Sequence, residues 1–362
     1  MRSVWLLALA ASGCRSLLGI DQPARGDAGP DGFAVCTHWH PEGFDPCALV
    51  ITADSLTLDG QAYIYNSGDG ALTDAAHQTV ITSGQTVEQT DGTRVAVLSV
   101  GRFTVTPTAH VTVMGPRPLL VVSWSAIVVD GALDAGSHLA VTDAPAHTAQ
   151  TVQVGAGANQ GCTTETGQDG VGASATGGSG GGGGGGFHGA GGPGGRGGGA
   201  SPVAGGPGGQ PAALTSIRGG CPGGASGAAG AVATLPAIQG SRALGGSGGG
   251  AIRLVALDSI EVRGAISVNG AGGAGAPRNS ACGGGGGGAG GYLGFEAPLV
   301  ALAGTITANG GGGGGGAGAT GDGSDGGDGA AASTGAPGGA VPADCGLAGG
   351  TGGATATLDG AA

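Results

Sequence analysis

The sequence predicts an all-β protein: a right-handed parallel β-helix (solenoid) with long glycine-rich insertions that leave it at one corner. Three observations support this. The eleven-residue pattern IEVRGAISVNG at residues 260–270 recurs three times elsewhere. Apolar or small residues fill every second position of the copies, as in a strand, and repetition of one strand unit indicates a solenoid. Long glycine-rich stretches begin where copies of the pattern end.

The other copies are VTPTAHVTVMG at residues 105–115, IVVDGALDAGS at 127–137 and VALAGTITANG at 300–310. The first two lie 22 residues apart, which suits one coil of two or three short strands. The later spacings, 133 and 40 residues, equal one coil plus an insertion. Short strands upstream keep their distance from the copies, so we expect each insertion to leave after the same point. The upstream strands are residues 119–122, 252–255 and 292–295, and the exit points are Ser137, Gly270 and Gly310.

The insertions contain runs of glycine, at residues 180–186, 283–288 and 310–316. Ordering a residue costs about 1 to 2 kcal/mol of backbone entropy, and glycine has no side chain whose burial could offset it. Only close packing of backbones could do so. The sequence leaves two alternatives open: extended polyproline-II-like strands with three residues per turn, packed side by side, or mobile loops.

The N-terminal residues 1–13 have the layout of an export signal: Arg2, an apolar run over 4–11, then small residues before Cys14. The tetrapeptide ASGC resembles the lipobox of bacterial lipoproteins. This resemblance implies that Cys14 is acylated and anchors the protein to a membrane, with an ordinary cleaved signal as the alternative. Arg15, which is not an inner-membrane retention signal, then implies the outer membrane or cell surface.

The remaining segments follow from composition. The composition of residues 14–35 predicts an acidic, Pro/Gly-rich tether. The β-rich region that follows begins with two cysteines, and we interpret it as the cap of the solenoid. The expected organisation is a cap at 36–92, coils at 93–137, a glycine-rich insertion at 138–249, coils at 250–310 with a glycine-rich loop at 271–290, and a glycine-rich C-terminal segment at 311–362.

Seven cysteines leave six after Cys14, an even number that suits disulfides in an exported protein. We expect Cys36 to pair with Cys47. The other four, Cys162, Cys221, Cys282 and Cys345, allow three connectivities, among which we favour Cys162 with Cys221 and Cys282 with Cys345.

The formal net charge of -12 argues against nucleic acid as a partner, because all twelve basic residues are arginines and none form a cluster. The membrane, through the lipid anchor, is the expected partner, with polysaccharide or other surface components as further candidates. No cofactor is indicated except a weak calcium site. Asp322, Asp325 and Asp328 offer three carboxylates among glycines, although we favour a solvated acidic turn over a calcium site.

No catalytic residue is assigned. The segment DGALD at residues 130–134 resembles the core repeats of the pectate-lyase-like superfamily of parallel β-helices. The hydrolase motifs of that superfamily (N-T-D, D-D, G-H-G and R-I-K) are missing. Arg253 or Arg263 could serve as the base of a lyase, but no acidic cluster accompanies them. The sequence therefore leaves enzymatic activity open and leans against it.

Taken whole, the chain resembles the uncharacterised glycine-rich surface lipoproteins of bacteria. The resemblance implies a surface location without a defined activity. We therefore expect a non-enzymatic surface protein with a structural or adhesive role in the extracellular layer. The alternatives are a carbohydrate-binding or carbohydrate-cleaving β-helix and, more weakly, ice or mineral binding by the glycine-rich face.

Overall fold

The computed structural model describes residues 38–139, 152–174, 177–228, 242–278, 283–318, 321–330, 334–343 and 348–353. Contacts divide the chain into two compact units, Met1–Ala48 and Leu49–Ala362. The described part of the first unit, residues 38–48, contains the short 3-10 helix η1 (Pro46–Ala48). Nowhere in the described ranges is there a helix with the length and apolar character needed to cross a membrane.

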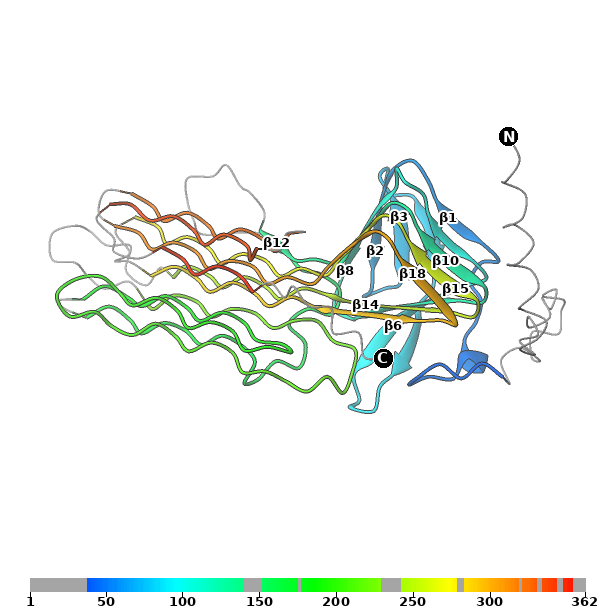
Figure 1. Ribbon diagram of the computed structural model, residues 1–362, viewed down its shortest axis with the longest axis horizontal. Helices are drawn as coiled ribbons and strands as arrows, with labels where there is room; N and C mark the ends of the chain where they lie inside the picture. Colours follow the sequence, from blue (N-terminus) through cyan, green and yellow to red (C-terminus); the bar gives the residue numbers. More distant parts are fainter. Residues whose placement is uncertain are drawn as a thin grey trace, which may run out of the picture. The chain divides into compact units, whose positions relative to one another are not determined.

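The second unit is all-β, as predicted (Figure 1). Three sheets account for most of its strands. In spatial order, sheet 1 holds β1 (Leu56–Leu58), β7 (Phe103–Val105), β10 (Ala126–Val129), β15 (Ser259–Val262) and β18 (Leu299–Leu302). Sheet 2 holds β19 (Thr305–Thr307), β16 (Ala265–Ser267), β11 (Ala132–Asp134), β8 (His110–Met114), β2 (Ala62–Asn66), β3 (Ala71–Asp74) and β4 (Thr79–Thr82). Sheet 3 holds β17 (Tyr292–Glu296), β14 (Ala251–Ala256), β9 (Leu119–Ser123), β6 (Arg94–Val100) and β5 (Gln85–Glu88).

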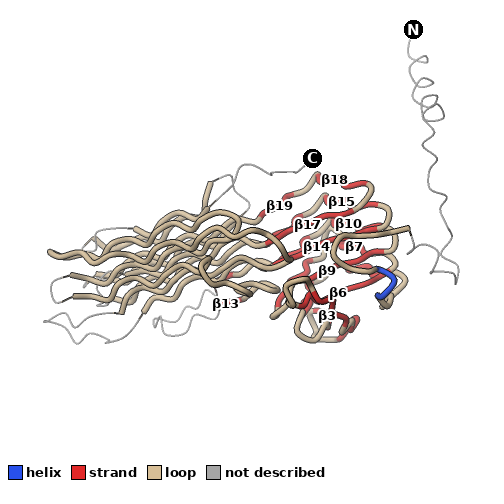
Figure 2. Tube along the Cα trace, turned by 90° about the horizontal axis from the view of Figure 1, so that it is seen from below, coloured by secondary structure: helices blue, strands red, loops and turns tan. Residues whose placement is uncertain are grey.

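The chain visits the sheets in a fixed order. It passes from sheet 3 to sheet 1 to sheet 2 through β9, β10 and β11, and repeats this circuit through β14, β15, β16 and through β17, β18, β19. Equivalent strands of successive circuits pair in parallel, one above another (Figure 2). Antiparallel strands β3, β4 and β5 extend the opposite edge. Parallel pairing already includes β1 and β2, inside the range assigned to the cap.

The register confirms the equivalence of three copies of the sequence pattern. Ile260 pairs with Ile127 on one side and with Val300 on the other. These residues point inward, and both isoleucines are fully buried. In each of these copies a glycine follows the first strand and forms the corner between sheet 1 and sheet 2. A Cβ on Gly264 would lie 1.9 Å from the carbonyl oxygen of Gly131, so the stacked corners leave no room for a side chain.

The fourth copy, at residues 105–115, is shifted in its first strand. Phe103, rather than Val105, pairs with Ile127, whereas Val111 pairs with Leu133 as the alignment predicted. The cause is the turn between the strands, which is two residues longer in this copy. The sequence alignment therefore matched the second strand and missed the first.

The glycine-rich segments follow strands of sheet 2, and the first two of them precede the sheet 3 strands β14 and β17. They run side by side over a long distance beyond the sheets (Figures 1 and 2). An isolated two-stranded pair, β12 (His138–Leu139) with β13 (Val152–Gln153), lies at their start. We call these segments the glycine bundle, defined by the described residues within 162–228, 242–250, 269–278, 283–291, 309–318, 321–330, 334–343 and 348–353.

The run at residues 178–186 shows how the bundle is held together. Its N–H groups bond to three different neighbours in rotation. Gly181 donates to the carbonyl of Gly195 (2.8 Å), Gly182 to Gly284 (2.9 Å) and Gly183 to Gln168 (2.9 Å). The next three residues meet the same neighbours again, through bonds from Gly184 to Gly192 (2.8 Å), Gly185 to Gly287 (2.9 Å) and Gly186 to Glu165 (2.7 Å). A β-strand cannot do this, because its N–H groups alternate between two directions in one plane.

Close approach of the backbones explains the glycine content. A Cβ on Gly182 would lie 1.9 Å from the carbonyl oxygen of Gly224, and one on Gly183 would lie 2.0 Å from that of Pro207. Other glycines have space, and a Cβ on Gly192 would meet nothing within 4 Å. The described glycine-rich residues therefore pack backbone against backbone, at distances that many of their neighbours allow only to glycine.

Candidate functional site

Asparagines mark two of the points where glycine-rich segments leave sheet 2. The side-chain oxygen of Asn269 accepts the N–H of Asn309 at 2.8 Å, and its Nδ2 donates to Oγ1 of Thr307 at 3.0 Å. Nδ2 of Asn309 donates to the carbonyl of Ala330 at 2.7 Å. These bonds join two successive circuits to the bundle, so the exits are held by specific polar contacts.

A second polar cluster at this junction is centred on His138. Its Nε2 lies 2.9 Å from Oδ2 of Asp134, at the end of β11, and its Nδ1 lies 3.4 Å from Oδ2 of Asp328 in the bundle. Asp134 also accepts a bond from the hydroxyl of Ser267 on β16 and from the N–H of Gly136. Both imidazole nitrogens have carboxylate partners, which suits a structural bridge better than a catalytic base.

The electrostatics of the cluster follow from these contacts. Hydrogen bonds to Asp134 and Asp328 raise the pKa of His138 to about 10, against the opposing effect of burial. Burial alone would raise the pKa of Asp134, but bonds from His138, Ser267 and Gly136 outweigh it and lower that pKa. The histidine is therefore a cation held between two carboxylates at neutral pH.

This bridge predicts a pH dependence of stability. Because the folded pKa of His138 lies above its unfolded value of about 6.5, its contribution is complete below that value and is lost as the pH rises towards 10. We expect the midpoint of thermal unfolding to fall between pH 6.5 and 10 more steeply in the wild type than in His138→Gln. His188→Gln, at an exposed histidine, is the control and should keep the wild-type slope. Equal slopes in all three proteins would mean that the ion pairs of His138 do not contribute to stability.

The three aspartates predicted as calcium ligands have a different role in the structure. Their carboxylates accept N–H bonds from a neighbouring bundle segment at every third residue: Asp328 from Gly272 (2.8 Å), Asp325 from Gly275 (2.7 Å) and Asp322 from Arg278 (2.6 Å). They lie in a row along the segment rather than around a point. Within the described ranges no three or more His, Cys, Asp or Glu side chains form a group that could hold a metal ion. The arrangement gives the calcium prediction no support.

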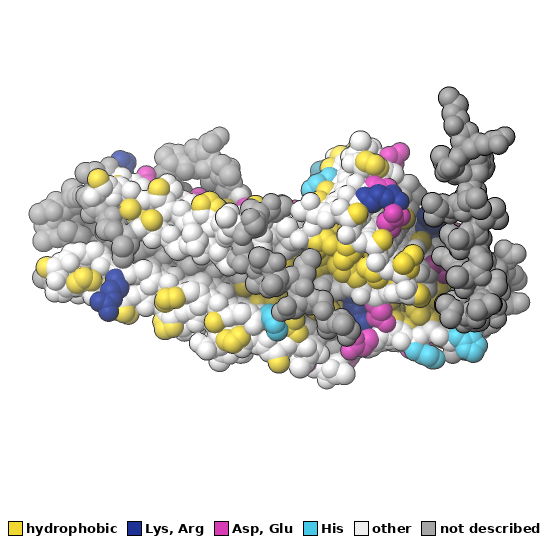
Figure 3. All heavy atoms as spheres, viewed as in Figure 1, with side chains coloured by type: hydrophobic (Ala, Val, Ile, Leu, Met, Phe, Trp, Pro, Cys, Tyr) yellow, Lys and Arg dark blue, Asp and Glu magenta, His cyan; other side chains and the backbone are white. Residues whose placement is uncertain are grey.

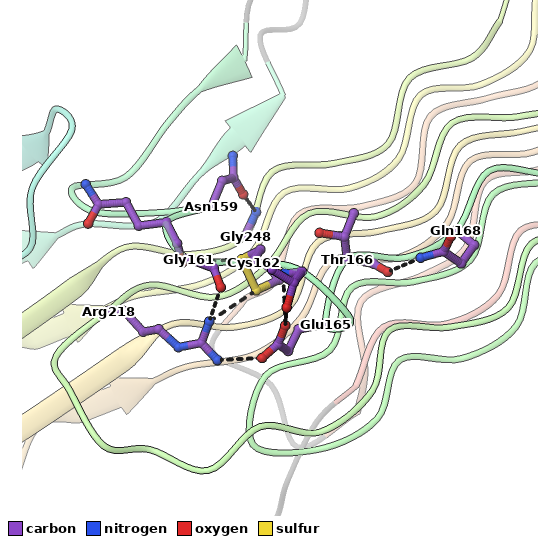
Figure 4. Close-up of a disulfide and its surroundings, with 11 residues drawn as sticks. Asn159, Gly161, Cys162, Glu165, Thr166, Gln168, Arg218 and Gly248 are labelled. Atoms are coloured by element: carbon purple, nitrogen blue, oxygen red, sulfur yellow. Dashed lines mark hydrogen bonds and ion pairs between the residues drawn. A yellow bond between two sulfur atoms is a disulfide. The ribbon is translucent and has the colours of Figure 1, made fainter. Parts of the chain in front are cut away.

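The predicted disulfide between Cys162 and Cys221 is present, with the Cα atoms 5.7 Å apart (Figure 4). It joins the first bundle segment to a later one, and Cys221 is completely buried. Cys47 also takes part in a disulfide. Its predicted partner Cys36, like Cys14, Cys282 and Cys345, lies outside the described residues.

Arg218 ties together the segments around this disulfide. Its guanidinium lies 3.2 Å from Oε1 of Glu165 and donates to the carbonyl of Gly161 at 3.4 Å (Figure 4). It also lies over the ring of Phe187, 5.5 Å from the ring centre. Hydrogen bonds from the backbone N–H groups of Thr163 and of Glu165 itself, followed by the charge of Arg218, lower the pKa of Glu165 to about 2. Glu165 is thus a permanent anion with a fixed partner. Its role is positioning rather than proton transfer.

A polar cleft of about 280 Å³ opens beside this cluster. One wall is the turn between β5 and β6, and the other is the loop before Arg218. The walls are held together by Gln89, whose amide makes two bonds with the backbone of Ile217, at 2.6 and 2.9 Å. The lining is rich in hydroxyl, carboxylate and amide groups: Asp91, Thr93, Gln160, Glu165, Thr215, Ser216 and Arg218. No sequence motif marked this cleft, because its residues come from segments that lie far apart in the chain.

The two arginines considered as lyase bases form ion pairs. Arg253 lies 2.5 Å from Oε2 of Glu296 on the neighbouring β17. Arg263 lies 2.8 Å from Oδ1 of Asp130 and 2.5 Å from Oε1 of Glu261. The first pair links two adjacent strands, whereas Arg263, directly after β15, pairs with a residue of that same strand and with the turn after β10. Each guanidinium is therefore held by carboxylate partners.

The geometry is the main guide to function here, because comparison with family models, curated proteins and solved structures finds no match.

Proposed function

We propose that the three sheets form a right-handed parallel β-helix and that the glycine bundle grows from one of its corners as polyproline-II-like strands. The crossover rule supports right-handedness, since β6 and β9 are parallel neighbours in one sheet and the chain passes through the other two sheets between them. The threefold rotation of hydrogen-bond partners supports the polyproline-II geometry, which has three residues per turn. The common order of exit from sheet 2 and return to sheet 3 supports the single corner.

We propose that the protein is a non-enzymatic, lipid-anchored surface protein of the outer membrane, with a structural or adhesive role. It would belong with the glycine-rich surface lipoproteins that its sequence resembles. The observation that carries the proposal is the backbone pairing of the bundle. Each segment of the bundle donates its backbone N–H groups to carbonyls of several neighbouring segments. Such a network makes the bundle stiff although it uses few side chains. Stiffness and reach are what a surface spacer or adhesin needs.

The test separates anchoring from the bundle. In cells that express the wild type, we expect the protein to label with palmitate and to fractionate with the outer membrane. Cys14→Ser should abolish both. Gly182→Ala, which disturbs the bundle, should keep the label and the fraction but lower cell adhesion and matrix retention, and Gly192→Ala should leave all four properties unchanged. If neither Cys14→Ser nor Gly182→Ala lowers adhesion, the structural role is refuted.

The polar cleft supports a second candidate, binding of a neutral saccharide. Hydroxyls, carboxylates and an amide are the groups that bind sugar hydroxyls, and the cleft is close in size to small-molecule sites. We expect a glycan array to show binding by the wild type that Thr215→Ala and Asp91→Ala weaken, whereas Thr73→Ala, on β3 and outside the lining of the cleft, retains it. An array on which the wild type binds nothing would eliminate this candidate. Ice or mineral binding stays a prediction, to be checked by thermal hysteresis.

A further inference from the structure

The glycine run at residues 283–288, which we call the central run, has a side on which the described residues provide no neighbour. Its N–H groups rotate through three directions along the chain. Two directions reach carbonyl acceptors, in residues 219–228 and in residues 269–278. The third direction belongs to Gly284 and Gly287, whose N–H groups meet no acceptor in the part of the chain that the structure describes. Both glycines are nevertheless buried.

The other two glycine runs border the same space. A Cβ on Gly184 would lie 3.4 Å from the backbone nitrogen of Gly192 and 3.7 Å from the carbonyl oxygen of Gly287. A Cβ on Gly313 would lie 3.3 Å from the backbone nitrogen of Gly350. Most other glycines of these runs would collide with a neighbouring backbone if they carried a Cβ. Gly184 and Gly313 therefore face an open space.

We call this space the glycine groove. Gly182 donates to the carbonyl of Gly284 at 2.9 Å, and Gly314 donates to that of Gly285 at 2.8 Å, so the central run touches both other runs. An outer segment of the bundle completes each wall. The groove is bordered by residues 178–186, 188–198, 283–288, 310–316 and 348–353.

Backbone N–H groups without acceptors line the groove on three sides. They lie on the central run and on the two outer segments, and none bonds to a described residue. The donors are the N–H groups of Gly192, Gly195, Gly284, Gly287, Gly350 and Gly353. Those of the central run are buried at the floor, whereas the other four glycines are exposed at the rims. Because a buried N–H group without a partner costs free energy, the floor favours a ligand that carries acceptors.

Carbonyl groups face the groove as well. In the runs at residues 178–186 and 310–316, the carbonyls also rotate through three directions, and those in one direction accept no N–H group from the described residues. These are the carbonyls of Gly182, Gly185, Gly311 and Gly314. Donors alone would suit an anion, whereas donors and acceptors together suit a peptide backbone. On the face that Figure 3 shows, the described bundle surface consists mainly of backbone and uncharged residues, so charge is a poor guide to its partner.

We propose that the glycine groove binds a run of glycines from another polypeptide in the polyproline-II conformation. Such a chain presents one N–H and one C=O group per residue, about 3.1 Å apart along its axis and in three directions by turn, as the walls require. The three runs that already lie inside the bundle are uninterrupted glycine, because their neighbours leave no room for side chains. The groove imposes the same condition on its ligand. This mode resembles the addition of a strand to a sheet edge, and it requires neither the lipid anchor nor the polar cleft.

The test uses a fluorescent peptide with about nine consecutive glycines, which make three turns, flanked by serines. We expect the wild type to bind it, and saturation should slow amide exchange at Gly284 and Gly287 about tenfold or more. Exchange at Leu254 in β14 should not change. A control peptide with valine at every third position should bind at least about tenfold more weakly, because its side chains would collide with the walls.

Two variants locate the binding. Gly184→Ala places a methyl group in the groove without a collision inside the bundle, and it should weaken peptide binding about tenfold. Gly172→Ala is the matched control. Its Cβ would lie 3.7 Å from the carbonyl oxygen of Ala228, on a segment that does not border the groove, and it should bind the peptide like the wild type. Both variants should keep the wild-type exchange rate at Leu254, which shows that they are folded.

Three results would overturn the proposal. The wild type could fail to bind the glycine peptide or bind the valine peptide equally well. Gly184→Ala and Gly172→Ala could bind the glycine peptide with the same affinity, which would place the peptide elsewhere. Finally, slow exchange at Gly284 and Gly287 in the absence of any peptide would mean that their N–H groups already have partners and that the groove is closed.

Discussion

Gly182→Ala should destabilise the glycine bundle strongly, although it adds only one methyl group. The new Cβ would lie 1.9 Å from the carbonyl oxygen of Gly224, which belongs to a neighbouring backbone and cannot rotate away. Overpacking of this kind costs about 1 to 3 kcal/mol, and a rigid backbone neighbour places this site at the upper end. Urea unfolding of the second unit measures the loss.

The matched control is Gly192→Ala, ten residues away in the same glycine-rich stretch. A Cβ there meets nothing within 4 Å. Replacement of a glycine by alanine without strain stabilises a protein by about 0.4 to 1 kcal/mol, because the unfolded chain loses freedom. The two variants should therefore shift the midpoint of unfolding in opposite directions. Equal and small shifts would mean that the backbones do not pack as the structure shows.

Removal of the disulfide should have the other large effect. Replacement of both Cys162 and Cys221 by alanine frees a loop of 59 residues. In the loop-entropy model this lowers the free energy of unfolding by about 4 kcal/mol, a large share of the stability of a chain with few aromatic residues. We expect the midpoint of thermal unfolding to fall markedly and the bundle to lose its amide protection first.

Cys47→Ala provides the control for the disulfide, since Cys47 lies in the first unit. It should leave the unfolding of the second unit within about 0.5 kcal/mol of the wild type. If the double variant unfolds like this control, then the disulfide contributes little and the backbone bonds alone hold the bundle.

Much of the sheet architecture could be predicted, because period-two alternation and repetition are local properties of a sequence. The pairing of Ile127 with Ile260 crosses 133 residues and was visible as a repeat. The shift at Phe103 was not visible, because turn length varies without changing the alternation on either side. The parallel pairing of β1 and β2, inside the range assigned to the cap, was not visible for a related reason: they resemble isolated short strands until their partners are known.

The polar clusters were harder to predict. Asp328 was singled out as a calcium ligand from its spacing to Asp325, and that spacing reflects the threefold period of the bundle segment instead. His138 and Arg218 carried no motif, since each gains its meaning from partners far along the chain. The pair Cys162 and Cys221 could be predicted only because the four cysteines of the glycine-rich region allow just three connectivities.

Residue-resolved amide exchange in a protein labelled with 15N-glycine and 15N-leucine tests the central claim most directly. Gly181, Gly182 and Gly183 are consecutive and donate to three different segments. Slow exchange at all three, comparable with Leu254 in the middle of β14, is the result that an ordered three-way bundle requires. Exchange of these amides at the rate of an unstructured glycine chain, while β14 stays protected, would contradict it.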